Sequence, residues 1–223
     1  MRPLLKICGL MRREDVALCC RLGVDICGFV TEYPLDVPWN LTREQCAPLI
    51  RSVSPPARSC IVTGGDREKI LSLALALKPD LVQLHFHETL EDTAAIVQAL
   101  SPYGIGVIKT VPADAEERLR QFGTEEPALC AELLCEAGVY AILVDGRGPS
   151  NAASAGVAAD LSLFRRIQAA SSRPVMLGGG ITPENCRDIA DQVRPEIIDV
   201  MTGAEAAPGI KSAKKIAELL SRL

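Results

Sequence analysis

The sequence lacks the features that mark several large classes of protein. No apolar stretch approaches the roughly 20 residues of a membrane-spanning helix, and the apolar run near the N-terminus is broken at Lys6, too early for the core of a signal peptide. Runs of lysine and arginine are missing, and the net charge is −4, which argues against binding to nucleic acid or to an anionic membrane. We therefore expect a cytoplasmic protein with neither a nucleic-acid partner nor a membrane partner.

Metal-ligand patterns are equally scarce. The nine cysteines are odd in number, and no two of them form a Cys-x-x-Cys pair, so neither a zinc ribbon nor a disulfide framework is expected. The only two histidines, His85 and His87, have the spacing that places two imidazoles on one face of a strand. A metal site needs further ligands, usually more histidines, and we therefore expect no metal.

What the sequence does contain is a regular alternation of short apolar strands and helical segments along its 223 residues. Strands are expected at residues 4–8, 25–30, 59–63, 81–85, 107–110, 141–144, 174–177 and 197–200. Helices are expected at residues 14–22, 43–52, 66–77, 89–100, 116–121, 128–137, 161–170, 183–193 and 213–223. Near-continuous apolar strands are typical of parallel strands buried on both faces, and their alternation with helices predicts right-handed βαβ units.

Eight such units predict an α/β protein, a single-domain (β/α)8 TIM barrel that spans residues 1–223. The alternative is an open, doubly wound sheet. That fold favours a Gly-x-Gly-x-x-Gly loop after its first strand, and the segment Cys8-Gly9-Leu10 lacks this pattern. We therefore favour the barrel, whose functional site lies at the carboxyl ends of its strands.

Polar residues occur where several of the expected strands end. Side-chain alternation puts Lys6 and Cys8 on one face of the first strand, and Gln83 and His85 on one face of the fourth. Such side chains in a barrel mouth are costly unless they are used or paired. The structural alternative for Lys6 is an ion pair with an interior carboxylate such as Asp199, and for His85 it is a hydrogen bond within the core.

Two glycine-containing loops follow the last two expected strands. Gly178-Gly179-Gly180 comes directly after residues 174–177, and Thr202-Gly203-Ala204 follows residues 197–200. In barrels that bind phosphorylated ligands the phosphate sits at these two loops, where backbone N–H groups face it and glycine allows close approach. The loops therefore predict a phosphate site, with plain tight turns as the alternative.

Several short motifs follow one another between Lys6 and Lys211. They are Lys6-Ile7-Cys8-Gly9, Gly28-Phe29-Val30, Val82-Gln83-Leu84-His85, Leu143-Val144-Asp145, Gly179-Gly180-Ile181-Thr182-Pro183-Glu184-Asn185, Ile198-Asp199-Val200, Gly203-Ala204-Glu205 and Pro208-Gly209-Ile210-Lys211. In this combination the chain resembles the phosphoribosylanthranilate isomerases of tryptophan biosynthesis.

The resemblance implies a cofactor-free Amadori rearrangement of N-(5-phosphoribosyl)anthranilate to 1-(2-carboxyphenylamino)-1-deoxyribulose 5-phosphate. It implies that Cys8 is the general base and Asp145 the general acid. Positive charge near Cys8 would favour the thiolate that a base requires. The expected substrate-binding residues are Lys6, Gln83, His85 and Asp199, and the expected phosphate-binding residues are Gly179, Gly180, Thr202, Gly203 and Ala204. The partner is then a phosphorylated small molecule, no cofactor is expected, and the chain is a monomer or a homodimer.

Three loops depart from the pattern of that family. The loop at residues 31–40 has gained Glu32 and Asp36 and has no arginine, where family members carry one that helps to hold the anthranilate carboxylate. Residues 153–156 read Ala-Ser-Ala-Gly in place of a glycine-rich stretch. Met201-Thr202-Gly203 stands in place of Ser-Ser-Gly.

These departures leave three interpretations. The chain carries out the family reaction with another cation, such as Arg147, in place of the missing arginine. Alternatively, it isomerises a different phosphorylated amino sugar, or it is a non-catalytic barrel that binds a phosphosugar. Because Cys8 and Asp145 are both kept, we favour the enzyme that carries out the family reaction.

Overall fold

The computed structural model describes the whole chain except residues 1, 147 and 149–155. Eight parallel strands close into a barrel in chain order, and β1 pairs with both β2 and β8. The strands are β1 (Leu4–Ile7), β2 (Ile26–Val30), β3 (Arg58–Thr63), β4 (Leu81–Leu84), β5 (Gly106–Thr110), β6 (Ala141–Asp145), β7 (Val175–Gly178) and β8 (Ile197–Val200). The predicted (β/α)8 barrel is confirmed.

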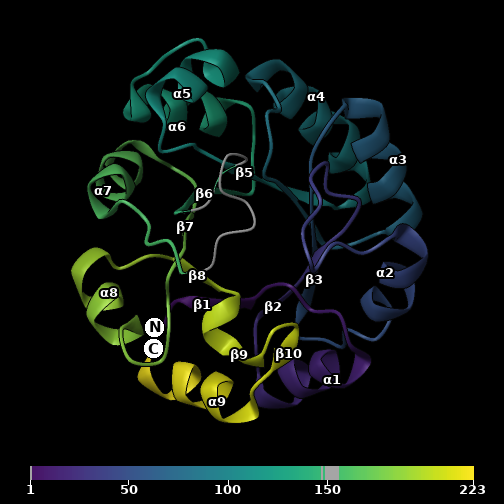
Figure 1. Ribbon diagram of the computed structural model, residues 1–223. Helices are drawn as coiled ribbons and strands as arrows, with labels where there is room; N and C mark the ends of the chain where they lie inside the picture. The colour runs from purple at the N-terminus through teal and green to yellow at the C-terminus, as the bar shows by residue number, and fades with distance from the viewer. Residues whose placement is uncertain (1, 147, 149–155) are drawn as a thin grey trace.

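Helices form a ring around the strands (Figure 1). They are α1 (Arg13–Leu22), α2 (Arg43–Ile50), α3 (Arg67–Leu77), α4 (Leu90–Leu100), α5 (Ala115–Phe122), α6 (Pro127–Glu136), α7 (Leu161–Ala170), α8 (Cys186–Val193) and α9 (Ala213–Arg222). Side-chain caps fix several starts, since Thr42 forms a capping box with Gln45 and Asp66 accepts a hydrogen bond from the backbone of Lys69. The interrupted pattern after residue 113 does form two helices, α5 and α6.

The connection from β8 to α9 holds elements that the alternation did not predict. A short 3-10 helix, Thr202–Ala204, leads into an antiparallel pair of strands, β9 (Glu205–Ala207) and β10 (Ile210–Lys211). Lys211 is buried there, and its Nζ lies 3.0 Å from Glu205 Oε1 and 3.2 Å from the carbonyl oxygen of Met201. The hairpin therefore fixes the turn that follows β8.

The barrel interior changes from apolar to polar along its axis. A compact apolar cluster fills the half nearer the strand starts: Ile26, Cys60, Leu81, Ile108, Ala141, Leu143, Met176 and Ile197. Two residues further along β1, β4 and β8, the inward positions are Lys6, Gln83 and Asp199. All three are buried, so the polar residues form the floor of the mouth at the carboxyl ends.

Candidate active site

A pocket of about 420 Å³, open to solvent, lies at the carboxyl ends of the strands. Its described lining is Cys8, Val30, Tyr33, Val37, Trp39, Val62, Gln83, His85, Asp145, Asp199 and Met201. The predicted base and the predicted acid therefore face the same space, together with three of the four expected substrate-binding residues. Lys6, the fourth, is not part of this lining.

Lys6 instead lies in the floor as half of a buried ion pair. Its Nζ donates a 2.8 Å hydrogen bond to Asp199 Oδ2, and both side chains are almost fully enclosed. Burial disfavours the ammonium charge, but the opposing charges of Asp199 and Cys8 outweigh it and raise the pKa of Lys6 above its ordinary value. The ion pair with Asp199 was the structural alternative for Lys6, and it is confirmed.

Cys8 follows β1 directly and is 4% exposed. Its backbone N–H donates to the carbonyl oxygen of Val200 at 2.9 Å, which ties it to the end of β8. A Cβ on Gly28 would lie 3.0 Å from Cys8 Sγ and 3.1 Å from Lys6 Cε. The glycine on β2 therefore leaves room for the thiol and the ammonium to lie close together.

Asp145 ends β6 and is 6% exposed. A Cβ on the neighbouring Gly178 would come within 2.9 Å of Asp145 Oδ2, so the first glycine of the triplet makes space for this carboxylate. Small residues beside Cys8 and Asp145 thus keep both reactive groups at the pocket surface.

His85 is oriented by two neighbours. Gln83 Nε2 donates to His85 Nδ1 at 3.3 Å, and Thr110 Oγ1 lies 2.9 Å from the same nitrogen. The backbone carbonyl of His85 accepts a 2.8 Å hydrogen bond from the hydroxyl of Tyr33. The ring is therefore fixed at the pocket edge, while its backbone anchors the loop that follows β2.

Two buried acceptor atoms in the floor have no hydrogen-bond partner within the described part of the chain. They are Gln83 Oε1 and Asp199 Oδ1, and both residues line the pocket. An unsatisfied buried acceptor costs about 1–3 kcal/mol. The floor is therefore set up to receive hydrogen-bond donors from a ligand.

A second hollow lies beside the pocket at the ends of β7 and β8. Its described lining is Gly156, Gly179, Gly180, Ile181, Asp199, Met201, Thr202 and Gly203. Four of the five predicted phosphate-binding residues therefore meet there. Ala204 does not, because it is fully buried and its N–H donates to the carbonyl oxygen of Met201.

Close backbone packing explains the glycines of this hollow. A Cβ on Gly203 would lie 1.9 Å from the carbonyl oxygen of Ile181, and Gly179 and Gly180 have φ values of 101° and 63°. Asn185 locks the preceding turn, since its Oδ1 accepts from Thr182 N–H at 2.8 Å and its Nδ2 donates to the Gly180 carbonyl. Because Asn185 holds the preceding residues in this turn, α8 begins at Cys186 and not at the expected residue 183.

The loop after β2 covers the pocket with apolar and aromatic side chains. Tyr33 and Val37 are buried, and Trp39 completes this wall. Glu32 points to Arg43, 2.9 Å from its Nε, and this hydrogen bond outweighs partial burial to lower the pKa of Glu32. The charge that the loop has gained at Glu32 is therefore compensated by α2. Residues 153–155 and Arg147 lie outside the described residues.

The two histidines have different neighbours. His85 lines the pocket, whereas the Nδ1 of His87 contacts Glu117 on α5. Within the described residues, no group of three or more His, Cys, Asp or Glu side chains is arranged to hold a metal ion. No helix in the described part of the chain is long and apolar enough to cross a membrane.

Comparisons with known proteins agree with this geometry. The family model of N-(5'-phosphoribosyl)anthranilate (PRA) isomerase matches residues 5–222. The N-(5'-phosphoribosyl)anthranilate isomerase of Methanopyrus kandleri is 33% identical over 220 residues, which cover 97% of this chain and 96% of that protein. The enzyme of the same name from Haloferax volcanii is 31% identical over 93% of this chain and 86% of that protein.

Solved structures give the same result. The phosphoribosylanthranilate isomerase of Thermotoga maritima superposes with a TM-score of 0.79 and 28% identity, covering 100% of this chain and 98% of the other. A complex of such an isomerase with reduced 1-(o-carboxyphenylamino)-1-deoxyribulose 5-phosphate matches with a TM-score of 0.77, 28% identity and the same coverage. This chain belongs to the N-(5'-phosphoribosyl)anthranilate isomerase family.

Proposed function

We propose that the chain catalyses the Amadori rearrangement of N-(5'-phosphoribosyl)anthranilate to 1-(2-carboxyphenylamino)-1-deoxyribulose 5-phosphate, a step of tryptophan biosynthesis. One observation carries the proposal: Cys8 and Asp145 line the same pocket, and that pocket adjoins a glycine-lined hollow at β7 and β8. An acid, a base and a phosphate cradle are what this reaction requires.

The rearrangement needs one proton delivered and one removed. Asp145 gives its proton to the furanose ring oxygen as the bond from that oxygen to C1′ breaks, and the nitrogen lone pair forms the C1′=N bond of a Schiff base. The thiolate of Cys8 then takes the proton from C2′, the electrons of that C–H bond form the C1′=C2′ bond of an enolamine, and the π electrons of the C1′=N bond return to nitrogen. Transfer of a proton from the C2′ hydroxyl to C1′ gives the ketone, so that substrate and product are isomers.

The floor residues support this chemistry in two ways. The ammonium of Lys6 stabilises the thiolate form of Cys8, so Lys6 acts through Cys8 and Asp199 and not by direct contact with substrate. Gln83 Oε1 and Asp199 Oδ1 accept hydrogen bonds from ribose hydroxyls, because these buried acceptors otherwise lack donors among the described residues. His85 lies at the pocket edge, where it orients the substrate.

The phosphate is held by backbone at Gly179, Gly180 and Gly203 and by the hydroxyl of Thr202. Side chains supply both the acid and the base, so the reaction needs neither a cofactor nor a metal. None of the nine cysteines, all of which lie in the described part of the chain, forms a disulfide, which fits the reducing cytoplasm that we propose as its location. A related solved structure is of monomers generated from the dimeric phosphoribosylanthranilate isomerase of Thermotoga maritima; for this chain, monomer or homodimer stays a prediction.

The test is turnover of freshly prepared N-(5'-phosphoribosyl)anthranilate by the purified protein, together with growth of a tryptophan auxotroph that lacks this step. Cys8→Ala and Asp145→Asn should each lower kcat about a thousandfold or more and abolish growth. Cys20→Ala, at a half-buried cysteine on α1, should retain activity. Ligand-induced thermal stabilisation without turnover by the wild type would identify a non-catalytic binding barrel and overturn the proposal.

A further inference from the structure

Three hollows form one continuous path across the barrel mouth. The phosphate hollow shares Asp199 and Met201 with the catalytic pocket. The catalytic pocket shares His85 and Asp145 with a third, larger hollow of about 1270 Å³, open to solvent, above β4, β5 and β6. Since β4 lies opposite β8 in the closed barrel, this third hollow lies across the mouth from the phosphate hollow.

Apolar side chains form two walls of the third hollow. Leu35 comes from the loop after β2, Phe86 from the loop after β4, and Pro112 and Ala113 from the loop after β5. Phe86 packs edge-on against Tyr33 with ring centroids 6.0 Å apart, and its N–H donates to Glu88 at 3.1 Å. These fixed walls suit a flat aromatic ring.

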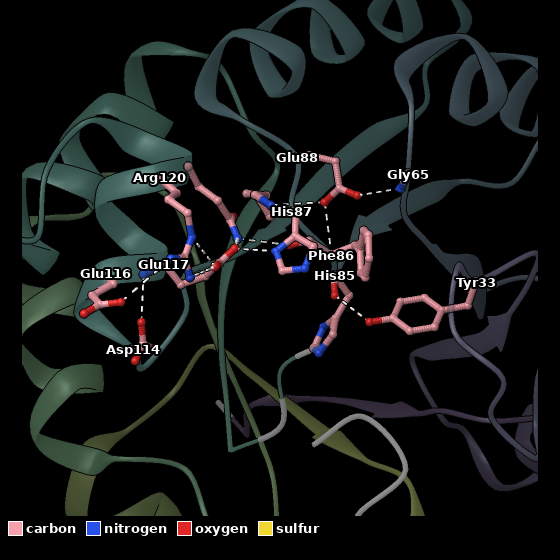
Figure 2. A network of polar contacts seen from close by, with 12 residues as sticks. Tyr33, Gly65, His85, Phe86, His87, Glu88, Asp114, Glu116, Glu117 and Arg120 are labelled. Atoms are coloured by element: carbon pink, nitrogen blue, oxygen red, sulfur yellow. Dashed lines mark hydrogen bonds and ion pairs between the residues drawn. The ribbon is translucent and has the colours of Figure 1, made fainter. Parts of the chain in front are cut away.

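The third hollow also carries two basic side chains at one edge, His87 and Arg120. Figure 2 shows both side chains meeting Glu117, which comes from α5. Arg120 Nε donates to Glu117 Oε2 at 2.9 Å, His87 Nδ1 contacts Glu117 Oε1, and Gln121 Nε2 donates to the same oxygen at 2.7 Å. Glu117 thus fixes the positions of both basic groups.

Both basic side chains remain accessible despite these contacts. The His87 side chain is 49% exposed and that of Arg120 is 63% exposed. No residue in the described part of the chain forms a hydrogen bond with His87 Nε2. A ligand group that enters the hollow can therefore reach Nε2 and the outer N–H groups of the guanidinium.

We propose that the third hollow receives the anthranilate ring of the substrate and that His87 and Arg120 bind its carboxylate. They would take over the task of the arginine that is missing from the loop after β2. This inference rests on the proposed function and assigns a specificity-determining role within it. Four carboxyl groups line the same hollow: Glu117 and Asp145, Asp114, which accepts the N–H of Glu117, and Glu116, which is 84% exposed and lies 3.8 Å from Arg120 Nη1.

The experiment compares two substrates that differ only in the carboxylate: N-(5'-phosphoribosyl)anthranilate and N-(5'-phosphoribosyl)aniline. His87→Gln keeps a side-chain donor to Glu117 but removes the imidazole and its Nε2, and Arg120→Met removes the guanidinium. Each variant should raise KM for the anthranilate substrate about tenfold, equivalent to about 1.4 kcal/mol, and leave KM for the aniline substrate within twofold. Arg120→Lys should recover part of the loss because it keeps the charge.

Arg166→Met is the matched control, since Arg166 is also an exposed arginine paired with a glutamate, but on α7. It should change neither KM. Equal effects of His87→Gln and Arg120→Met on the two substrates, or no effect on either, would overturn the inference. A carboxylate-specific loss in Arg147→Met, with His87→Gln and Arg120→Met unchanged, would overturn it in favour of Arg147. If the wild type turns over neither substrate, the proposed function itself fails, which is a distinct result.

Discussion

The two sides of the barrel mouth offer a ligand different contacts, mainly backbone on one side and side chains on the other. On the β7–β8 side, the hollow is lined largely by glycines, and the chain passes so close to itself that Gly203 has no room for a Cβ. On the β2–β5 side, the walls are side chains, including Tyr33, Trp39 and Phe86. A backbone cradle can be lost only by disturbing the fold, whereas a side-chain wall changes by single substitutions. This difference explains why Met201-Thr202-Gly203 departs from the family pattern in its side chains but keeps its glycine, while the loop after β2 lacks the arginine of that pattern.

The largest effect is expected on the backbone side. Gly203→Ala places a Cβ 1.9 Å from the carbonyl oxygen of Ile181, so the phosphate loop must move. We expect kcat/KM to fall about a hundredfold, equivalent to about 2.7 kcal/mol, for both the anthranilate and the aniline substrates, because both carry the phosphate. Steady-state kinetics measures this, with circular dichroism to confirm the fold. A loss of less than threefold, or one confined to the anthranilate substrate, would show that the backbone at β7 and β8 does not bind the phosphate that both substrates share.

A smaller effect, on stability, is expected on the side-chain side. Burial opposes the charge of Glu117, but hydrogen bonds from Gln121, His87 and Arg120 prevail and lower its pKa to about 2. A carboxyl whose pKa is depressed in the folded state stabilises the protein fully above its ordinary pKa of 4.5 and loses that contribution as the pH falls towards 2. Glu117→Gln should therefore lower the free energy of unfolding by about 1–3 kcal/mol at pH 7.

Urea unfolding of the wild type and of Glu117→Gln between pH 7 and pH 2 checks this expectation. The difference in unfolding free energy between them should shrink as the pH falls below 4.5. Glu116→Gln, one residue away on α5 but 84% exposed, is the control and should stay within about 0.5 kcal/mol of the wild type. A difference that is constant with pH would mean that Glu117 acts by packing and not by its charge.

Periodicity predicts the barrel and the strand ends that face its mouth, whereas the roles of the acid and the base come from the family resemblance. Apolar strands that alternate with helices dictate the closed sheet, and strand alternation brings Cys8, Gln83 and Asp199 to one mouth. The pair of β9 and β10 was missed because strands of two or three residues carry no periodic signal. Cys8 and His85 lie one residue beyond β1 and β4, and their backbone N–H groups still donate to Val200 and Thr63 on the neighbouring strands.

The third hollow could not be predicted in the same way. Glu117 and Arg120 lie on α5, where their pattern is that of an ordinary amphipathic helix, and only the tertiary contact with His87 gives them a part in the site. The two-residue spacing of His85 and His87 was the one available signal. This spacing resembles a metal pattern, but both histidines line the third hollow and His85 also lines the catalytic pocket. Which helix faces a strand end is set by packing, which a local pattern does not contain.

The smallest expected effect tests the charge balance of the third hollow. Glu116 Oε2 lies 3.8 Å from Arg120 Nη1 and is exposed, so it competes weakly with an incoming carboxylate for the guanidinium. Glu116→Gln should lower KM for the anthranilate substrate about twofold at low salt, because exposed ion pairs contribute less than about 1 kcal/mol. The gain should disappear in about 1 M salt, where screening is nearly complete, and should be absent with the aniline substrate at any salt concentration. A rise in KM, or an equal change for both substrates, would show that the carboxylate does not bind at Arg120. The β2–β5 side would then contribute only apolar contacts to the substrate.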